Sequence, residues 1–332
     1  MRALGLALLL SACTPGGKPY DYPLDHVLRL DEVQVKATHN SYHVETIDVP
    51  EWEYTMAPLA VQLDRQGVRG VELDLQWVGD ARGGGHHFEV FHVTIGDEGT
   101  TCRLLTDCLR AVRAWSDRYP GHLPLYLELE PKPGYDPGAL EDYFAVLERE
   151  VLSVFPRDRV LTPDELLGSA ATIPAALANG WPTLDGLRGR VFFALDDHAE
   201  VRAAYTHGLA DLRGRLLFVD STPSDPYGAI AIHNDPADTV AIHAAQAAHL
   251  LVRTMSDDGG YEARANNTTH RDEALASGAT WVSTDYPVTM GGLAYVVEIP
   301  GGTPARCNPV TASASCTPLA LEDPRYVGSQ NP

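Results

Sequence analysis

The segment VQVKATHN, residues 33–40, is a short apolar run that ends in the polar residues His39 and Asn40. The same plan recurs along the chain. The further runs are GVRGVELDLQW (67–77), FEVFHV (88–93), LPLYLELEPK (123–132), RVFFALDD (190–197), RLLFVDS (215–221), HLLVRTMS (249–256) and TWVSTDYP (280–287). Short apolar runs of this length, closed by polar residues, predict eight β-strands.

Stretches with helical spacing separate most of these runs. Residues 104–121 place Leu105, Leu109, Val112 and Trp115 on one face and stop at Pro-Gly. The other predicted helices are 138–156, 238–250 and 267–279. Strands that alternate with helices pair in parallel, so we predict an α/β fold, an irregular single-domain (β/α)8 TIM barrel.

Two features bear on this fold prediction. The connection VGDARGGGHH between the second and third runs has no helix, so the barrel is expected to be irregular there. An open doubly wound sheet is the alternative, but no Gly-rich dinucleotide fingerprint follows the first strand.

The chain is strongly acidic. Its 332 residues carry a formal net charge of −20 at pH 7, and 44% of them are hydrophobic, enough for a large core. This balance argues against nucleic acid as a partner, because phosphate binding needs clustered Lys and Arg. Acidic residues gathered at one place would instead hold a hard cation such as Ca²⁺. A monomer is the default expectation.

The first residues, MRALGLALLLSAC, combine an Arg, an apolar run and small residues before Cys13. This pattern predicts an export signal that is too short to span a bilayer, and its end resembles a bacterial lipobox. We therefore expect a lipoprotein signal peptide at 1–12, a Pro- and Gly-rich tether at 13–25 and the barrel domain at 26–332. Lipidated Cys13 would anchor the exported protein in the bacterial cell envelope.

Cysteine counting agrees with an exported lipoprotein. Five cysteines are an odd number for an oxidising compartment, but Cys13 as the anchor leaves four. Cys102 lies near Cys108 and Cys307 near Cys316, so two local disulfides are expected. The sequence does not exclude the other pairings.

The predicted strands end in carboxylates. Side chains alternate along a strand, so Glu72 and Asp74 point to one face, as do Glu128 and Glu130. Together with the carbonyl oxygen of Asn40 they would make a site of hard oxygen ligands, suited to Ca²⁺ or Mg²⁺. Solvated strand ends, or partners of Lys and Arg, are the simpler interpretation of either pair alone.

Two histidines adjoin these strand ends. His39 and His92 are predicted to face each other across the barrel mouth, on the first and third strands. Such a pair can give and take protons near neutral pH, and beside a divalent ion it suits phosphodiester cleavage. A single histidine in a strand is more often a structural residue. His43 is interpreted as a cap of the first loop.

At larger scale the chain resembles a known family. The segments ATHNSYH, GVRGVELDLQW, FHV, LPLYLELEPK, LTPDELLG, WPTLDGLRGRVFFALDD, ARANNTTHRDEALASGATWVSTDYP and RCNP resemble, in order from about residue 30 to residue 320, the bacterial Ca²⁺-dependent phosphatidylinositol-specific phospholipase C-like family. The resemblance implies a TIM-barrel phosphodiesterase that converts phosphatidylinositol-type lipids to diacylglycerol and a (cyclic) inositol phosphate.

The resemblance also implies residue roles. It assigns catalysis to His39 and His92. The calcium ligands would be Asn40, Glu72, Asp74 and Glu130, with Glu128 as the alternative to Glu130. The substrate contacts would be Lys132 at the phosphate or headgroup, and Arg253 and Tyr286 at the headgroup.

One departure from the family pattern concerns the headgroup. Met255 in VRTMSDD stands where a second basic residue is expected, which argues against a polyphosphorylated inositol. Two other classes remain open. A glycerophosphodiester phosphodiesterase has a similar barrel, but its usual HRG opening is replaced here by HNS. A surface lipoprotein could bind phospholipid without catalysis, although it would not need two opposed proton carriers.

Overall fold

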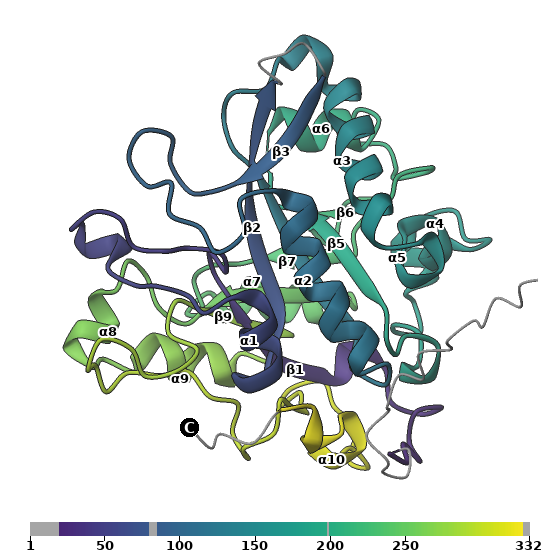
Figure 1. Cartoon of the computed structure of the whole chain (residues 1–332). Coiled ribbons are helices and arrows are strands. Elements are labelled where there is room, and N and C mark those ends of the chain that lie inside the picture. Colours follow the sequence, from purple (N-terminus) through teal and green to yellow (C-terminus); the bar gives the residue numbers. More distant parts are fainter. Residues whose placement is uncertain (1–19, 80–84, 198, 328–332) are drawn as a thin grey trace, which may run out of the picture.

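Eight parallel strands form the barrel predicted from the sequence (Figure 1). The computed structural model describes residues 20–79, 85–197 and 199–327. The barrel strands are β1 (Val33–Thr38), β2 (Val68–Gly79), β4 (Leu125–Pro131), β5 (Val191–Leu195), β6 (Phe218–Val219), β7 (Ile230–Ile232), β8 (Leu251–Met255) and β9 (Trp281–Thr284). They pair in the order β6-β5-β4-β2-β1-β9-β8-β7.

The two ends of this order meet and nearly close the barrel. Asp220, just after β6, forms a parallel bridge with Ile230 in β7. The Asp220 carboxylate also accepts a hydrogen bond from the backbone N–H of Ile232, at 2.7 Å. A side chain thus completes a seam that is too short for a full strand ladder.

The prediction of the third strand was wrong. Run 88–93 gives β3 (His86–Val90), which pairs antiparallel with β2 from Leu75 to Gly79, so it is a hairpin partner and no barrel strand. The two strands project together past the rest of the barrel (Figure 1). The eighth barrel strand is β7, which the sequence analysis missed because three residues are too few to show a period.

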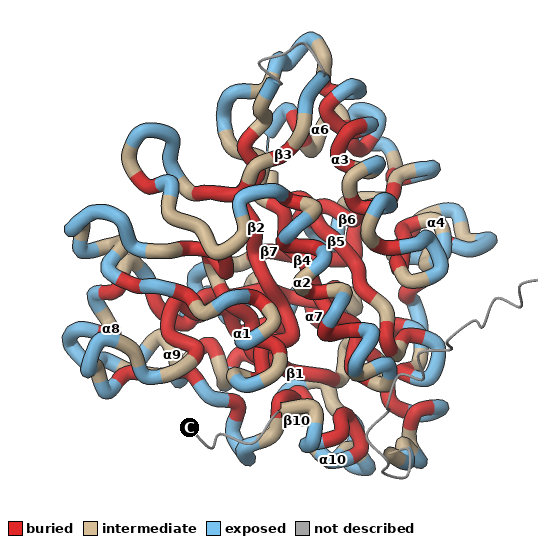
Figure 2. The backbone as a smooth tube through the Cα atoms, viewed as in Figure 1, coloured by how far each residue is buried: buried red, intermediate tan, exposed pale blue. Residues whose placement is uncertain are grey.

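Helices surround the barrel. They are α1 (Leu59–Arg65), α2 (Leu105–Arg118), α3 (Leu140–Val154), α4 (Pro163–Leu167), α5 (Ile173–Ala176), α6 (Glu200–Tyr205), α7 (Thr239–Ala247), α8 (Tyr261–Ala265), α9 (Thr269–Ala276) and α10 (Pro318–Leu321). The predicted apolar face of α2 is buried. Figure 2 shows the buried strands enclosed by elements whose outer faces are exposed.

The barrel interior changes from apolar to charged along its axis. Near the amino ends of the strands, Tyr126 stacks on Trp281 with ring centroids 4.0 Å apart. Gly70 makes room for them, because a Cβ there would lie 2.9 Å from the Ala37 side chain and 3.2 Å from Trp281. The parallel register then sets Glu72 beside Glu128, one layer further toward the carboxyl ends. The fold therefore separates a stabilising end from a polar end.

The C-terminal segment covers the amino end of the barrel. Its strand β10 (Ala305–Cys307) pairs antiparallel with the start of β1. The disulfide Cys307–Cys316 lies in this segment, and the disulfide Cys102–Cys108 joins the start of α2 to the preceding loop. These are the two cysteine pairs expected from the sequence.

The expected signal peptide and Cys13 lie outside the described residues, as does most of the tether. Among the residues that the structure describes, no helix is both long and apolar enough to cross a bilayer.

Candidate active site

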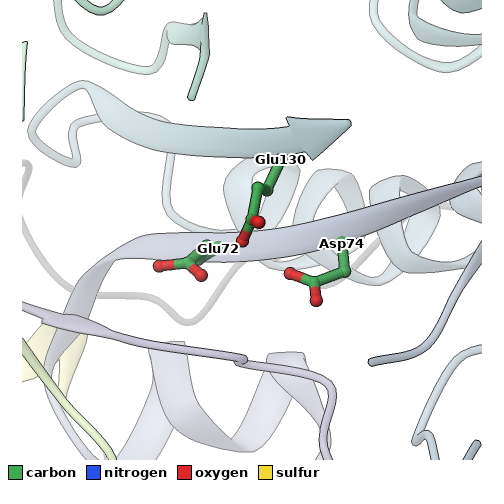
Figure 3. A group of neighbouring side chains, drawn as sticks. All are labelled: Glu72, Asp74 and Glu130. Carbon is green, nitrogen blue, oxygen red and sulfur yellow. The ribbon is translucent and has the colours of Figure 1, made fainter. Parts of the chain in front are cut away.

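Two carboxylates on β2 and one on β4 form an acidic cluster at the carboxyl end of the barrel (Figure 3). Glu72 and Asp74 point inward from β2, and the register places Asp74 beside Glu130 on β4. One oxygen from each of the three residues lies within 4.8 Å of the other two. Glu72 and Asp74 are buried and Glu130 is half-buried, so water screens their mutual repulsion poorly.

The acidic cluster fits a hard divalent cation. Burial raises the pKa of Asp74 well above its usual range, although Lys132 opposes the shift. Lys132 Nζ lies 2.7 Å from both Asp74 Oδ2 and Glu130 Oε1. The buried Asp74 Oδ1 accepts no hydrogen bond from the described residues. One cation thus bridges two of the carboxylates already, and the unpaired oxygen is of the type that Ca²⁺ prefers.

Asn40, a predicted calcium ligand, lies in the turn after β1. Its φ of 41° is in the left-handed region, which Asn adopts more readily than most residues. Its Oδ1 accepts a hydrogen bond of 2.9 Å from the Tyr42 hydroxyl. Burial, and then the charge of Asp74, raise the pKa of Tyr42 well above its usual range. Tyr42 therefore connects the Asn40 amide to the acidic cluster.

Glu128 lies outside the acidic cluster. Its Oε2 accepts a hydrogen bond of 3.0 Å from the Tyr126 hydroxyl and lies 3.5 Å from Arg253 Nε. The buried guanidinium of Arg253 also donates to Glu72 and to Asn234. Burial raises the pKa of Glu128 well above its usual range. The geometry therefore favours Glu130 over Glu128 as a metal ligand. Glu128 instead pairs with Arg253.

His39 lies between two carboxylates. Its Nδ1 is 2.8 Å from Asp285 Oδ1, and its Nε2 is 3.7 Å from Glu72 Oε1. Burial alone would lower the pKa of His39, but the charges of Asp285 and Glu72 outweigh it and raise the pKa to about 10. Asp285 thus holds the Nδ1 side of the ring, and Nε2 is directed toward the acidic cluster.

His92 reaches the site by a different route from the one predicted. It lies in the loop after β3 rather than on a barrel strand opposite β1. The Gln76 side chain donates to its backbone carbonyl at 3.1 Å, and its Nδ1 lies 3.0 Å from Asp97 Oδ2. Burial lowers the pKa of His92, and the charges of Lys132 and His39 lower it further. The loop after the β2–β3 hairpin thus places His92 close enough to Lys132 and His39 for their charges to act on it.

Comparison with known families agrees with this geometry. Residues 85–309 match the family model described as phosphoinositide phospholipase C, Ca²⁺-dependent, which spans more than half of the chain. The chain belongs to this family. Its members are Ca²⁺-dependent phosphoinositide-specific phospholipases C, enzymes that cleave a phosphodiester, and the acidic cluster is the part of this phospholipase that suits the ion.

Two bacterial phospholipases C of solved structure share this fold. A calcium-dependent phosphoinositol-specific phospholipase C from Pseudomonas sp. is 22% identical, with a TM-score of 0.59 over 87% of this chain and 98% of that chain. A Ca²⁺-dependent phosphatidylinositol-specific phospholipase C from Streptomyces antibioticus is 20% identical, with a TM-score of 0.54 over 78% and 95%. At these identities the likeness establishes the fold. No curated protein matches the chain significantly.

A cavity of about 460 Å³ opens onto the site of this phospholipase, and its lining includes His39, Glu72, Glu130, Arg253 and Met255. Tyr286 is not part of that lining. It lies with Tyr54 on a separate cavity of about 580 Å³. Of the three predicted substrate contacts, Arg253 therefore lines the first cavity and Lys132 contacts Glu130 in its lining. Tyr286 lines the second cavity instead.

Two carboxylates that hold the histidines had no role in the sequence prediction. Asp285 ends the last strand run, so its position was a usable signal. Asp97 lies in the loop after His92 with no strand or motif around it, and only the tertiary structure shows its contact.

Proposed function

We propose that this phospholipase cleaves phosphatidylinositol between the phosphate and diacylglycerol, and that His39 and His92 carry the protons. The 2-hydroxyl of inositol attacks phosphorus, diacylglycerol leaves as an alcohol, and the resulting cyclic inositol phosphate is then hydrolysed. The observation that supports this proposal best is one cavity lined by His39, Glu72, Glu130 and Arg253, with the acidic cluster in its wall.

In this proposal the histidine pair balances the protons. One imidazole accepts the proton of the attacking hydroxyl, and the other donates a proton to the departing diacylglycerol oxygen. Asp285 and Asp97 each fix one ring by its Nδ1. Bound Ca²⁺, held by Glu72, Asp74, Glu130 and Asn40, would stabilise negative charge on the phosphoryl oxygens.

We assign the contacts with the phosphorylated headgroup to Arg253 and Lys132. Both cations are already paired with carboxylates, Arg253 with Glu72 and Lys132 with Asp74 and Glu130. Their positive charge is therefore largely balanced before the substrate arrives. Met255 adds an apolar surface at the cavity. This environment supports a headgroup whose single phosphate is the scissile diester.

A substrate comparison tests the proposed function. Phosphatidylinositol and glycerophosphoinositol are offered side by side, each with Ca²⁺ or with EGTA, and the products are followed by ³¹P NMR. Cyclic inositol phosphate from the lipid, lost with EGTA, is the expected result. A monoester formed directly from the soluble diester would indicate a glycerophosphodiester phosphodiesterase. No turnover of either diester would indicate a binding protein.

We further propose that the protein is a lipid-anchored monomer of the bacterial cell envelope. Support comes from the lipobox-like end of the first segment and from the two disulfides, which suit an oxidising compartment. Cys13→Ser should release the protein from the membrane fraction of its native host into the soluble fraction. Retention of that variant on the membrane would contradict the anchor.

A further inference from the structure

A carboxylate outside the acidic cluster joins two histidines. Asp97 is fully buried in the loop after His92. Its Oδ2 lies 3.0 Å from His92 Nδ1 and 2.8 Å from His43 Nε2, and its Oδ1 accepts a hydrogen bond of 3.3 Å from Thr46. His43 is also fully buried, with Nδ1 2.9 Å from the carbonyl oxygen of Tyr54. The loops after β1 and β3 thus meet in a His43–Asp97–His92 chain.

The partners of His43 determine where its protons lie. The Tyr54 carbonyl can only accept, so His43 Nδ1 carries a hydrogen. Asp97 accepts a hydrogen bond from the Thr46 hydroxyl at Oδ1, and its Oδ2 lies between His43 Nε2 and His92 Nδ1. An ionised Asp97 can accept from all three groups, and such contacts favour the charged carboxylate. His43 Nε2 must then carry a hydrogen as well. A doubly protonated His43 would balance the charge of Asp97.

We infer that His43 is a positioning residue for His92, because it neutralises Asp97 and lets that carboxylate orient the His92 imidazole without adding net negative charge beside it. His92 Nδ1 donates to Asp97, so Nε2 is the nitrogen that exchanges a proton. The catalytic meaning of this inference rests on the proposed function. Its electrostatic content does not, since it concerns the free protein.

The surroundings of the two catalytic histidines agree with this arrangement. The charged and titratable groups that face His92 among the described residues are Asp97, His43, Lys132 and His39. The carboxylate beside His92 has a histidine on its other side. Among the described residues, the Asp285 carboxylate beside His39 has no second histidine. Burial lowers the pKa of both rings, but at His39 the charges of Asp285 and Glu72 outweigh it, whereas at His92 the Asp97 contact does not.

Histidine NMR of the purified, ¹⁵N-labelled protein in EGTA tests the inference. In the wild type near pH 7, both ring nitrogens of His43 should resonate as protonated. In His43→Gln, which keeps a donor toward Asp97 but loses the charge, the titration midpoint of His92 should rise by about one pH unit or more. In the double variant His43→Gln/Asp97→Asn it should return close to the wild-type value, because no charge remains.

Thr46→Val is the matched control, since it removes a hydrogen bond from the same carboxylate without removing a charge, and it should leave the His92 midpoint unchanged. A neutral His43 in the wild type would overturn the inference without any variant having to fold. An unshifted His92 in His43→Gln would overturn it too, as would a double variant that stays shifted.

The pH profile of kcat/KM extends the test to catalysis. The apparent pKa that the pH profile assigns to His92 should rise in His43→Gln and return to the wild-type value in the double variant. A purely structural role of His43 would lower the rate at every pH without changing that apparent pKa. If the wild type turned over no phosphodiester, the proposed function would fail, yet the NMR result would still decide the role of His43.

Discussion

At the scale of single residues, His39 and His92, the two histidines proposed to be catalytic, differ in whether their carboxylate is shared with another histidine. Asp285, just after β9, is hydrogen-bonded to His39 alone of the histidines in the described residues. Asp97, in a loop, is hydrogen-bonded to both His92 and His43. Both arrangements fix a ring by its Nδ1 and leave Nε2 for proton transfer. The loss of either ring should therefore remove chemistry rather than folding.

His39→Ala and His92→Ala should each lower kcat by about 10² to 10⁴-fold, the usual contribution of a positioned acid or base. Turnover of phosphatidylinositol at saturating Ca²⁺ measures the effect, and thermal unfolding checks the fold. His243→Ala, on the exposed side of α7, is the control and should keep its rate. A wild-type rate in His39→Ala would refute the mechanism.

Glu130→Gln and Asp74→Asn should raise the Ca²⁺ concentration for half-maximal effect by about tenfold or more, since each removes a charged ligand worth at least about 1.4 kcal/mol. Glu128→Gln should shift it less, because Glu128 faces Arg253. Calcium titrations of the melting temperature measure the shift, because an ion that binds only the folded state stabilises it. Equal shifts for Glu128→Gln and Glu130→Gln would contradict the assignment of the cluster.

At the scale of elements, the two ends of the barrel have separate tasks. The carboxyl ends of β1, β2, β4 and β8 carry the site, while the C-terminal segment covers the amino ends. A fully buried ion pair joins this segment to the barrel: Arg69 Nε on β2 lies 2.7 Å from Glu322 Oε2. Glu322 Oε1 also accepts the backbone N–H of Leu123, at 2.8 Å.

Glu322→Gln should lower the free energy of unfolding by about 3 to 5 kcal/mol, because it leaves the Arg69 charge buried without a counter-ion. Activity per folded molecule should stay unchanged, since the pair lies at the end of the barrel away from the site. Urea unfolding measures the loss. The control is Arg110→Gln, which breaks the exposed pair with Asp107 and should cost less than about 1 kcal/mol.

At the scale of the whole molecule, one buried histidine makes stability depend on pH. His122 accepts a hydrogen bond of 2.7 Å from the Ser116 hydroxyl and donates to the carbonyl of Leu123. Burial lowers its pKa from 6.5 to about 3, although the Leu123 contact opposes the shift. Above pH 6.5 the ring is neutral in both the folded and the unfolded chain, so this contribution to stability is fully present there.

Below pH 6.5 the unfolded chain binds a proton that folded His122 cannot bind until about pH 3. The free energy of unfolding should therefore fall by about 1.4 kcal/mol per pH unit from this residue alone. The raised pKa of His39 does not alter this pH window. Below pH 6.5 that ring is protonated in both the folded and the unfolded chain, so its contribution to stability no longer changes with pH. His122→Asn should flatten the slope by about one proton in urea unfolding between pH 4 and 6. An unchanged slope would show that other groups dominate.

The sequence by itself determined the alternation of strands and helices, the apolar face of α2 and the inward pairs Glu72–Asp74 and Glu128–Glu130. These features depend on local periods of 2 and 3.6 residues, which can be read from neighbouring positions. The same periods placed the carboxylates at strand ends, and the family resemblance completed the list of site residues.

Only the tertiary structure decided which of those residues are partners. The antiparallel course of β3, the closure through β7, the contact of Glu128 with Arg253 and the contacts of Asp285 and Asp97 all join positions that are distant in the chain or lie in loops without a period. Such contacts depend on register and on how the barrel closes, and no local pattern encodes them. A one-residue shift of β4 against β2 would separate Glu130 from Asp74 while leaving the sequence pattern unchanged.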